Sequence, residues 1–341
     1  MNANLGIEGR VVHDSCIQCP FHAWTIDGET GNCVVGKDKK VKEGIQYEYE
    51  FDCNKESYEF KSKKTEKIKI KKFLSREQDG YIFVWFSAKK NESGDEKEFV
   101  APYLPFDLSE HMKRLYHRGF SLNLVNAHIS DIAENGGDLL HFKYIHSSII
   151  PLLVSGSWDA KWIRGDDPKL REKLHLKNPK HNEYRTKLLD KFLTEKTKKY
   201  IGVIHLFNEL NIMNILDGQH FFTLTGFQLG PGLVYLFIQG KFFETMLIQH
   251  IDTKDKYHQE VYHEIYCDWM TPYWFSALQL RLEVRQVLND GVVWDNKKFA
   301  YKSYFSNNVE EDECLISWRK WFSQFYEGCK EEEEKKNSLT W

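Results

Sequence analysis

The sequence predicts an α+β fold, in which a small all-β domain precedes a domain with one long helix lying over an antiparallel sheet. Residues 201–213, 220–229 and 232–243 are strand-like, and Gly230-Pro231 marks the turn that joins the last two. A helical apolar pattern then begins at Thr271-Pro272 and runs to residue 290, with the threonine as the expected N-cap. A long helix on a curved sheet leaves room for an internal pocket.

The chain is expected to have four parts. Turns containing aspartate and glycine separate short strands near the N-terminus, and charged residues dominate the linker and the tail. The parts are a β-rich domain at residues 1–90, a linker at 91–99, a second domain at 100–327 and a charged tail at 328–341. Within the second domain, the charged residues 166–199 predict an insertion or irregular loop, and residues 250–266 predict one further strand.

The composition argues against several classes of protein. The 47 basic and 50 acidic side chains leave a net charge of −3, so no basic excess indicates nucleic acid as the main partner. Seven unevenly spaced cysteines do not form a disulfide framework, which favours a reducing compartment. The sequence has no run of about 18 apolar residues, so no membrane span is expected in this chain.

The most informative motif is Asp138-x2-His141-x4-His146, in a segment expected to be helical. Two neighbouring imidazoles can supply two of the three ligands of a non-haem Fe(II) site, which takes two histidines and one carboxylate. On an ideal helix His146 lies about 140° around the axis from His141, so both rings reach one metal only where the helix is distorted or ends between them. Gly136-Gly137 offers a place for irregular backbone. The alternative is two histidines that sit on a helix and cap its end.

The third ligand must come from elsewhere in the chain. Asp290 is the expected one, because it ends the apolar helical pattern and a helix end facing the pocket would bring it near the histidines. Asp295 lies beyond Gly291 and is the competing candidate. Either residue could instead be a surface carboxylate.

A second motif, Cys19-x2-His22, is typical of one of the two loops that hold a Rieske [2Fe–2S] cluster. The other loop carries Cys-x-His, and this pattern occurs nowhere in the chain, so half of the ligand set is absent. One alternative is a buried thiol beside an ordinary surface histidine. Another is a zinc site made of His13, Cys16, Cys19 and His22, although ten residues leave little chain to wrap a tetrahedron.

Together these motifs resemble those of the Rieske non-haem iron oxygenases, and among them the Neverland-type cholesterol 7-desaturases. The resemblance covers about residues 3–310. The segments that carry it are Ala3-Asn4-Leu5-Gly6, the run from Cys16 to Trp24, the run from Asp27 to Cys33, Asn126-Ala127-His128, and Glu134-Asn135-Gly136-Gly137-Asp138.

The resemblance implies a partial all-β Rieske domain followed by a START-like catalytic domain with a helix over an antiparallel sheet. Cys19 and His22 would hold part of the cluster, whereas His141, His146 and Asp290 would hold mononuclear Fe(II). Asp138 would bridge His141 and the cluster histidine of a neighbouring subunit in a homotrimer. The residues expected to line the substrate cavity are Phe221, Phe222, Phe227, Leu236 and Phe237.

The activity implied is conversion of cholesterol to 7-dehydrocholesterol with O2 and electrons relayed from the Rieske cluster to the mononuclear iron. A ferredoxin or a reductase using NAD(P)H would supply the electrons. By the same comparison, the missing cluster histidine would precede Met1, so the chain is expected to be truncated and to lack the anchor that places relatives at the endoplasmic reticulum membrane. The alternatives are a Rieske hydroxylase of another steroid and a catalytically inactive sterol-binding remnant.

Overall fold

The computed structural model describes residues 103–297 and 310–325, with short gaps at 147, 151–153, 175–178, 213–215 and 241, and separate short segments between residues 9 and 85. The chain divides into two compact units, of which the first contains Met1–Arg76 and Ile82–Ser87 and the second contains Glu77–Tyr81 and Ala88–Trp341. The predicted linker at 91–99 and tail at 328–341 lie outside the described residues.

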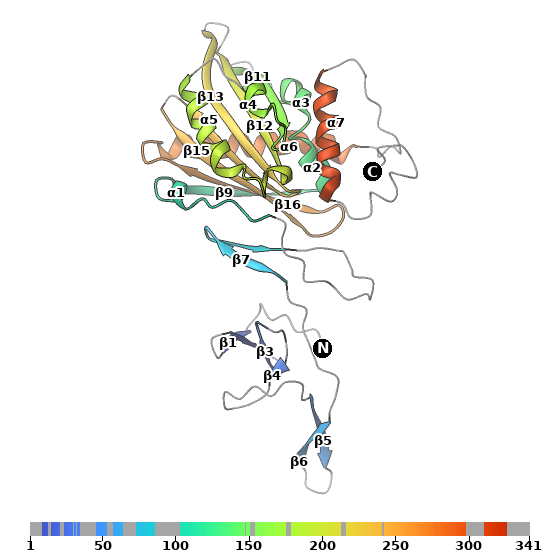
Figure 1. Cartoon of the computed structure of the whole chain (residues 1–341). Coiled ribbons are helices and arrows are strands. Elements are labelled where there is room, and N and C mark those ends of the chain that lie inside the picture. The colour runs from blue at the N-terminus through green and yellow to red at the C-terminus, as the bar shows by residue number, and fades with distance from the viewer. Residues whose placement is uncertain are drawn as a thin grey trace. The chain divides into compact units, whose positions relative to one another are not determined.

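The described elements before residue 85 are all strands (Figure 1). Four of them form an antiparallel sheet in chain order, namely β1 (Arg10–Val12), β2 (Cys16–Gln18), β3 (Thr25–Asp27) and β4 (Cys33–Val34). Two further pairs are β5 (Gln46–Asp52) with β6 (Ser57–Lys63), and β7 (Ser75–Gln78) with β8 (Tyr81–Val84). The turn between β7 and β8 contains Asp79 at φ 54° and Gly80 at φ 85°, the backbone that a two-residue hairpin loop requires.

The second unit is built on an eight-stranded sheet in which all neighbouring strands are antiparallel. The order across it is β10-β11-β12-β13-β14-β15-β16-β9, so the first strand of the unit pairs with the last. The bounds are β9 Tyr116–Val125, β10 Ser148–Ile150, β11 Val154–Arg164, β12 Ile201–Ile212, β13 Leu216–Leu229, β14 Leu233–Gly240, β15 Glu244–Thr253 and β16 Gln259–Cys267. The predicted antiparallel sheet is therefore confirmed.

The prediction of one strand at 250–266 is wrong, because this stretch contains the turn between β15 and β16. The turn is closed by a hydrogen bond from the backbone nitrogen of Lys254 to the carbonyl oxygen of His258. Ile251 pairs with Val261, so apolar residues continue to alternate on both sides of the turn. The alternation therefore did not reveal where one strand ended.

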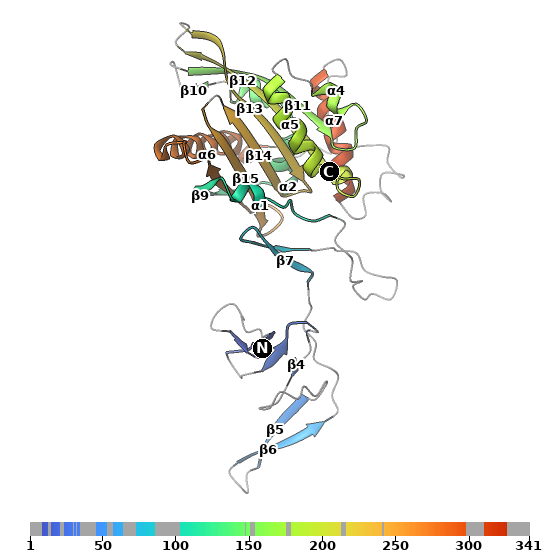
Figure 2. The same ribbon diagram turned by 60° about the vertical axis from the view of Figure 1, so that its left-hand side comes forward.

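Helices cover both faces of the sheet (Figures 1 and 2). On one face α5 (Pro179–Phe192) packs through Leu188, Leu189 and Phe192 against a core that includes Phe227 and Phe237 of the sheet. The shorter elements of the unit are α1 (Ser109–Met112), α4 (Leu170–Lys173), η1 (Lys198–Tyr200) and η2 (Ser323–Phe325). The prediction of an irregular loop at 166–199 is wrong, because residues 179–192 form α5, whose apolar residues are buried against the sheet.

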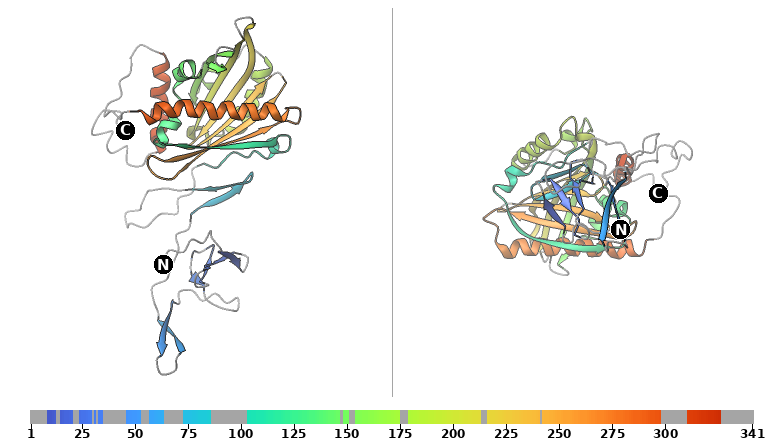
Figure 3. Two further views of the ribbon diagram at one scale, coloured as in Figure 1. Left: turned by 180° about the vertical axis from the view of Figure 1, so that it is seen from behind. Right: turned by 90° about the horizontal axis from the view of Figure 1, so that it is seen from below.

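The opposite face carries α2 (Ile129–Glu134), α3 (Leu139–Tyr144), α6 (Tyr273–Asp295) and α7 (Glu310–Phe322). Figure 3 shows α6 lying across this face of the sheet. Trp318, Trp321 and Phe322 of α7 are almost completely buried in a second core with Trp162 and Ile204. Among the described residues, no helix combines the length and apolar content needed to cross a membrane.

The long helix is confirmed, but its two ends differ from the prediction. Its N-cap is Pro272, without a side-chain capping bond, while Thr271 donates through its backbone nitrogen and its hydroxyl to Asp268. The helix continues past Gly291 to Asp295, because one glycine weakens a helix without ending it. Asp290 consequently lies in the body of α6 rather than in its last turn.

Candidate metal centre

His141 and His146 are separated by the end of a helix. The carboxylate of Asp138 caps α3 by accepting a hydrogen bond from the backbone nitrogen of His141 at 3.4 Å. The helix ends at Tyr144, and the backbone nitrogen of Ile145 donates to the carbonyl oxygen of His141 at 2.7 Å. His146 follows this C-cap, so the requirement that the helix end between the two histidines is met.

The glycine pair before Asp138 allows close packing against α7. A Cβ atom at Gly137 would lie 2.5 Å from Cβ and Cγ of Trp318, and one at Gly136 would lie 3.2 Å from Oε1 of Gln228. Trp318 donates through its indole nitrogen to the same Gln228 oxygen at 2.9 Å. The connection from α2 to α3 is thus held against the buried wall of the sheet, which positions His141.

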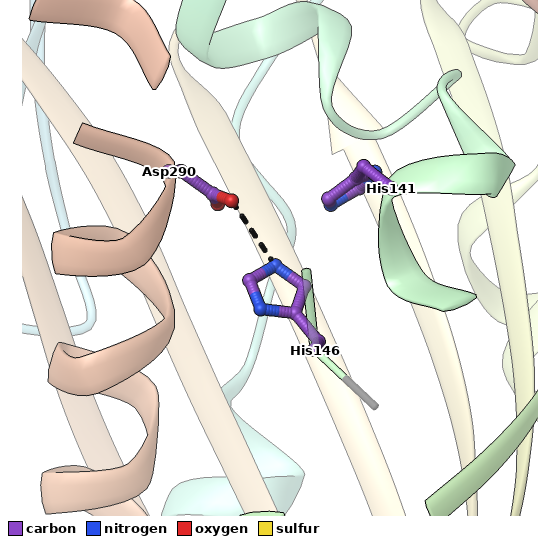
Figure 4. Close-up of side chains that lie close together, drawn as sticks. All are labelled: His141, His146 and Asp290. Atoms are coloured by element: carbon purple, nitrogen blue, oxygen red, sulfur yellow. Dashed lines mark ion pairs between the residues drawn. The ribbon is translucent and has the colours of Figure 1, made fainter. Parts of the chain in front are cut away.

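The structure brings His141, His146 and Asp290 together in the interior of the second unit (Figure 4). One ligand-capable atom of each lies within 4.8 Å of those of the other two. Nε2 of His146 is 3.2 Å from Oδ1 of Asp290, and the two imidazole centroids are 5.0 Å apart. The three residues are only 8%, 5% and 7% exposed, whereas Asp295 is exposed at the surface.

Further contacts orient the three side chains. Nδ1 of His141 donates to the backbone carbonyl oxygen of Asp138, so a metal would be bound through Nε2. Asn135 donates from Nδ2 to Oδ2 of Asp290 at 2.8 Å, which leaves Oδ1 directed toward His146. Burial is the main cause that lowers the pKa of His141, and a neutral imidazole is the form that binds metals.

These residues fit a mononuclear Fe(II) site. Two imidazoles and one carboxylate are the ligand set of the facial triad found in non-haem iron oxygenases. Ionisable groups are rarely buried together unless they are paired, hydrogen-bonded or bound to a metal. Asn135 and the carbonyl of Asp138 also supply the outer contacts that usually hold metal ligands in place.

The triad borders a cavity of about 170 Å³ between the sheet and α6. Its wall is mostly apolar and includes Ile204, Phe222, Leu224, Leu236, Val261 and Val287. Of the expected lining residues, Phe222 and Leu236 are confirmed, whereas Phe227 and Phe237 belong to the core on the other face. Successive side chains of a strand point to opposite faces, so these residues could not all line one cavity. The side chain of Phe221 lies outside the described residues.

Comparison with known families identifies the class of protein to which this centre belongs. Residues 84–326 match the family described as 3-Ketosteroid 9alpha-hydroxylase C-terminal domain. The chain belongs to this family. The matched segment contains the whole triad and the sheet that carries the cavity, and the family is one of Rieske oxygenases, which confirms the resemblance inferred from the motifs.

Curated relatives of this oxygenase-family chain are named cholesterol 7-desaturases. The relative from Ciona intestinalis is 28% identical over 336 residues, which cover 96% of this chain and 58% of the relative. Those from Drosophila melanogaster and Caenorhabditis elegans are 29% and 26% identical and cover 96% of this chain. The chain spans 64% and 66% of these two relatives, so it corresponds to less than two thirds of each of the three proteins.

Solved structures share the fold of this oxygenase-family chain. Dicamba monooxygenase bound to dicamba superposes with a TM-score of 0.52 at 12% identity, over 93% of this chain and 81% of that protein. An NdmA variant of Pseudomonas putida with theobromine gives a TM-score of 0.50 at 15% identity, over 95% and 75% of the two chains. At these identities the similarity establishes the fold alone.

One buried acid in the cavity was not predicted. Glu283 lines the cavity on α6, and burial raises the pKa of its carboxyl group to about 7. Glu283, Val287, Asp290 and Trp294 share one face of the helix and all border the cavity. This spacing was visible in the sequence and could have indicated Glu283 once Asp290 was chosen.

The proposed cluster half-site is described only in part. Cys19 is half-buried, and its backbone nitrogen donates to the carbonyl oxygen of Trp24 at 2.7 Å across the hairpin. His22 and His13 lie outside the described residues. The Rieske half-site and the alternative zinc site therefore both stay predictions.

Changing Asp138 should separate helix capping from metal binding. We expect Asp138→Ala to lower the free energy of unfolding by about 1 kcal/mol, because the cap is lost, and Asp138→Asn to leave it nearly unchanged, because asparagine caps equally well. Urea unfolding of both variants measures the difference. The Asn variant should also retain its Fe(II), and loss of the metal from this variant would make Asp138 a ligand.

Proposed function

We propose that this chain is the iron-binding part of a sterol desaturase that converts cholesterol to 7-dehydrocholesterol. The observation that carries the proposal is a buried set of two histidines and one aspartate beside an apolar cavity. The names of the curated relatives favour a sterol as the substrate of such a cavity. The balanced reaction takes O2, two electrons and two protons, removes two hydrogens from the sterol and releases two molecules of water.

Each part of the site has a physical role in this proposal. His141, His146 and Asp290 would hold the iron, and Asn135 keeps the aspartate aligned. When bound, Fe(II) supplies the oxygen chemistry that acts on a carbon–hydrogen bond of the substrate. The apolar wall on β13 and β14 would bind the sterol rings and exclude water from the reacting carbons.

The residues of the proposed iron site do not themselves supply the electrons that the reaction needs. Cys19 and His22 offer half of a Rieske ligand set, and no Cys-x-His follows elsewhere, so this chain does not fit a complete [2Fe–2S] cluster. We assign electron supply to a ferredoxin or an NAD(P)H-dependent reductase, with Asp138 beside the receiving histidine. Assembly as a homotrimer and association with the endoplasmic reticulum membrane belong to the same proposal.

The test is a product assay on the purified chain loaded with Fe(II). Cholesterol, O2, ferredoxin, its reductase and NADPH are supplied, and sterols are extracted and identified by mass spectrometry. Formation of 7-dehydrocholesterol that depends on O2 and on His141 supports the proposal. A hydroxylated steroid as the product would instead favour the hydroxylase that the family description names. Saturable cholesterol binding without any product would identify an inactive sterol-binding protein.

A further inference from the structure

Two of the polar side chains in the cavity wall already have structural roles. Asn135 donates to Asp290 at 2.8 Å and so belongs to the metal centre. Gln228 donates from Nε2 to the carbonyl oxygen of Ala133 at 3.2 Å and accepts from the indole of Trp318 at 2.9 Å. Asn135 thus joins the connection around α2 and α3 to α6, and Gln228 joins it to the sheet, so neither amide is needed to explain recognition of a ligand.

A second set of polar side chains lies at the wall of the same cavity. Gln249 of β15 and Glu283 of α6 both line the cavity, and His263 of β16 lies between them. Nε2 of His263 is 3.1 Å from Oε1 of Gln249 and 3.6 Å from Oε1 of Glu283. The side chain of His263 is 0% exposed, whereas 22% of the side chain of Glu283, which lines the cavity, is accessible.

The separation between Glu283 and the triad sets the length that a ligand needs in order to contact both. Glu283 precedes Asp290 by seven residues, so two helical turns, or about 10 Å, separate their backbones on one face of α6. Val287 lies between them on that face, and Leu236 and Val261 complete an apolar wall. The cavity therefore has a metal-binding end, an apolar middle and an acidic end.

We propose that Glu283, supported by His263 and Gln249, binds the hydroxyl group of an apolar polycyclic alcohol whose reacting carbon faces the triad. A hydroxyl group both donates and accepts hydrogen bonds, so it can pair with a carboxylate as donor or with a carboxylic acid as acceptor. Burial raises the pKa of Glu283 to about 7, which keeps both forms accessible near neutral pH. An anionic head group, such as a sulfate ester, would be repelled by the ionised form of Glu283, so we expect it to bind more weakly than an alcohol.

This inference rests on the proposed function, because it assumes that the cavity holds the substrate. It adds a determinant of specificity about two helical turns from Asp290 along α6. A hydrogen bond to a charged group is stronger than one between neutral groups, so its loss should weaken binding by about tenfold or more.

The test compares cholesterol with cholest-5-ene, the same skeleton without the hydroxyl group. Dissociation constants are measured on the Fe(II)-loaded chain by competition with a fluorescent sterol. We expect Glu283→Leu to weaken cholesterol binding at least tenfold and to leave cholest-5-ene binding within threefold of the wild type. Glu283→Gln should retain most of the affinity for cholesterol, since an amide still pairs with a hydroxyl. Asp295→Ala, on the surface of the same helix, serves as the control and should change neither value.

Each contrary result has a distinct meaning. If Glu283→Leu weakens both ligands equally while iron content is retained, Glu283 only shapes the cavity and the hydroxyl anchor is wrong. If the wild type binds both ligands equally well, the anchor is wrong while a sterol-binding function stands. If the wild type binds neither ligand, the proposed function fails and the anchor fails with it.

Discussion

Replacing Asp290 with alanine is expected to remove mononuclear iron from the protein. The variant would keep two buried imidazoles but lose the only carboxylate in the described cluster. Changes to groups that merely orient ligands weaken metal binding by about 10–100-fold, so loss of a ligand should weaken it by more. Equilibrium titration with Fe(II) under anaerobic conditions, followed by metal analysis after gel filtration, measures the effect.

The same helix provides the matched control. Asp295 is exposed at the end of α6, five residues beyond Asp290, and Asp295→Ala should bind Fe(II) like the wild type. Asn135→Ala should bind Fe(II) with an affinity between those of Asp290→Ala and Asp295→Ala, because Asp290 keeps its carboxylate but loses the hydrogen bond that aligns it. Retention of iron in Asp290→Ala together with its loss from Asp295→Ala would reverse the ligand assignment.

Adding one methyl group at Gly137 is expected to destabilise the protein by about 1–3 kcal/mol, the usual cost of overpacking a core. The new Cβ would lie 2.5 Å from Trp318, a residue with no exposed surface. Trp318 cannot simply move aside, because it stacks on Phe322 at 4.4 Å between centroids and donates to Gln228. The turn must therefore shift instead, and Asp138 follows directly after it.

Gly291→Ala is the matched control, because it adds the same methyl group to the same protein. Nothing lies within 4 Å of a Cβ at Gly291, which sits inside α6. The change should stabilise the protein by about 0.5–1 kcal/mol, since alanine favours a helix more than glycine does. Urea unfolding curves give both values, and a Gly137→Ala variant as stable as Gly291→Ala would contradict the packing described for Trp318.

The grouping of His141, His146 and Asp290 could be predicted from the sequence to a large extent. The spacing of His141 and His146 allowed a shared metal only if the helix ended between them, and the structure shows this end at Tyr144. Its place in the apolar pattern favours Asp290 over Asp295 as the third ligand. The exposure of the two residues agrees with this choice, because Asp290 is buried and Asp295 is exposed. The local pattern is informative here because His141 and Asp290 lie in helices and His146 follows directly after the C-cap of α3.

Features that depend on the packing of distant segments were harder to predict. The charged residues of α5 suggested a loop. Its three buried apolar residues can be recognised as a packing face only when the helix is seen against the sheet. Glu283 is hard to single out because a glutamate in a helix is usually solvated, whereas here α6 places it in the cavity wall near His263. In both cases the environment of the residue depends on which face of the sheet its helix covers.

The alternation along β13 and β14 has a consequence for how such proteins diversify. Leu224 and its cross-strand partner Ile238 face the cavity, whereas Phe227 and its partner Tyr235 face the opposite core. Ligand preference and folding stability are therefore encoded in separate, interleaved positions of the same two strands. Mutations at the cavity positions can change which ligand is bound without disturbing the packing of the opposite core. Related chains can therefore differ in ligand selectivity while they keep their folding stability.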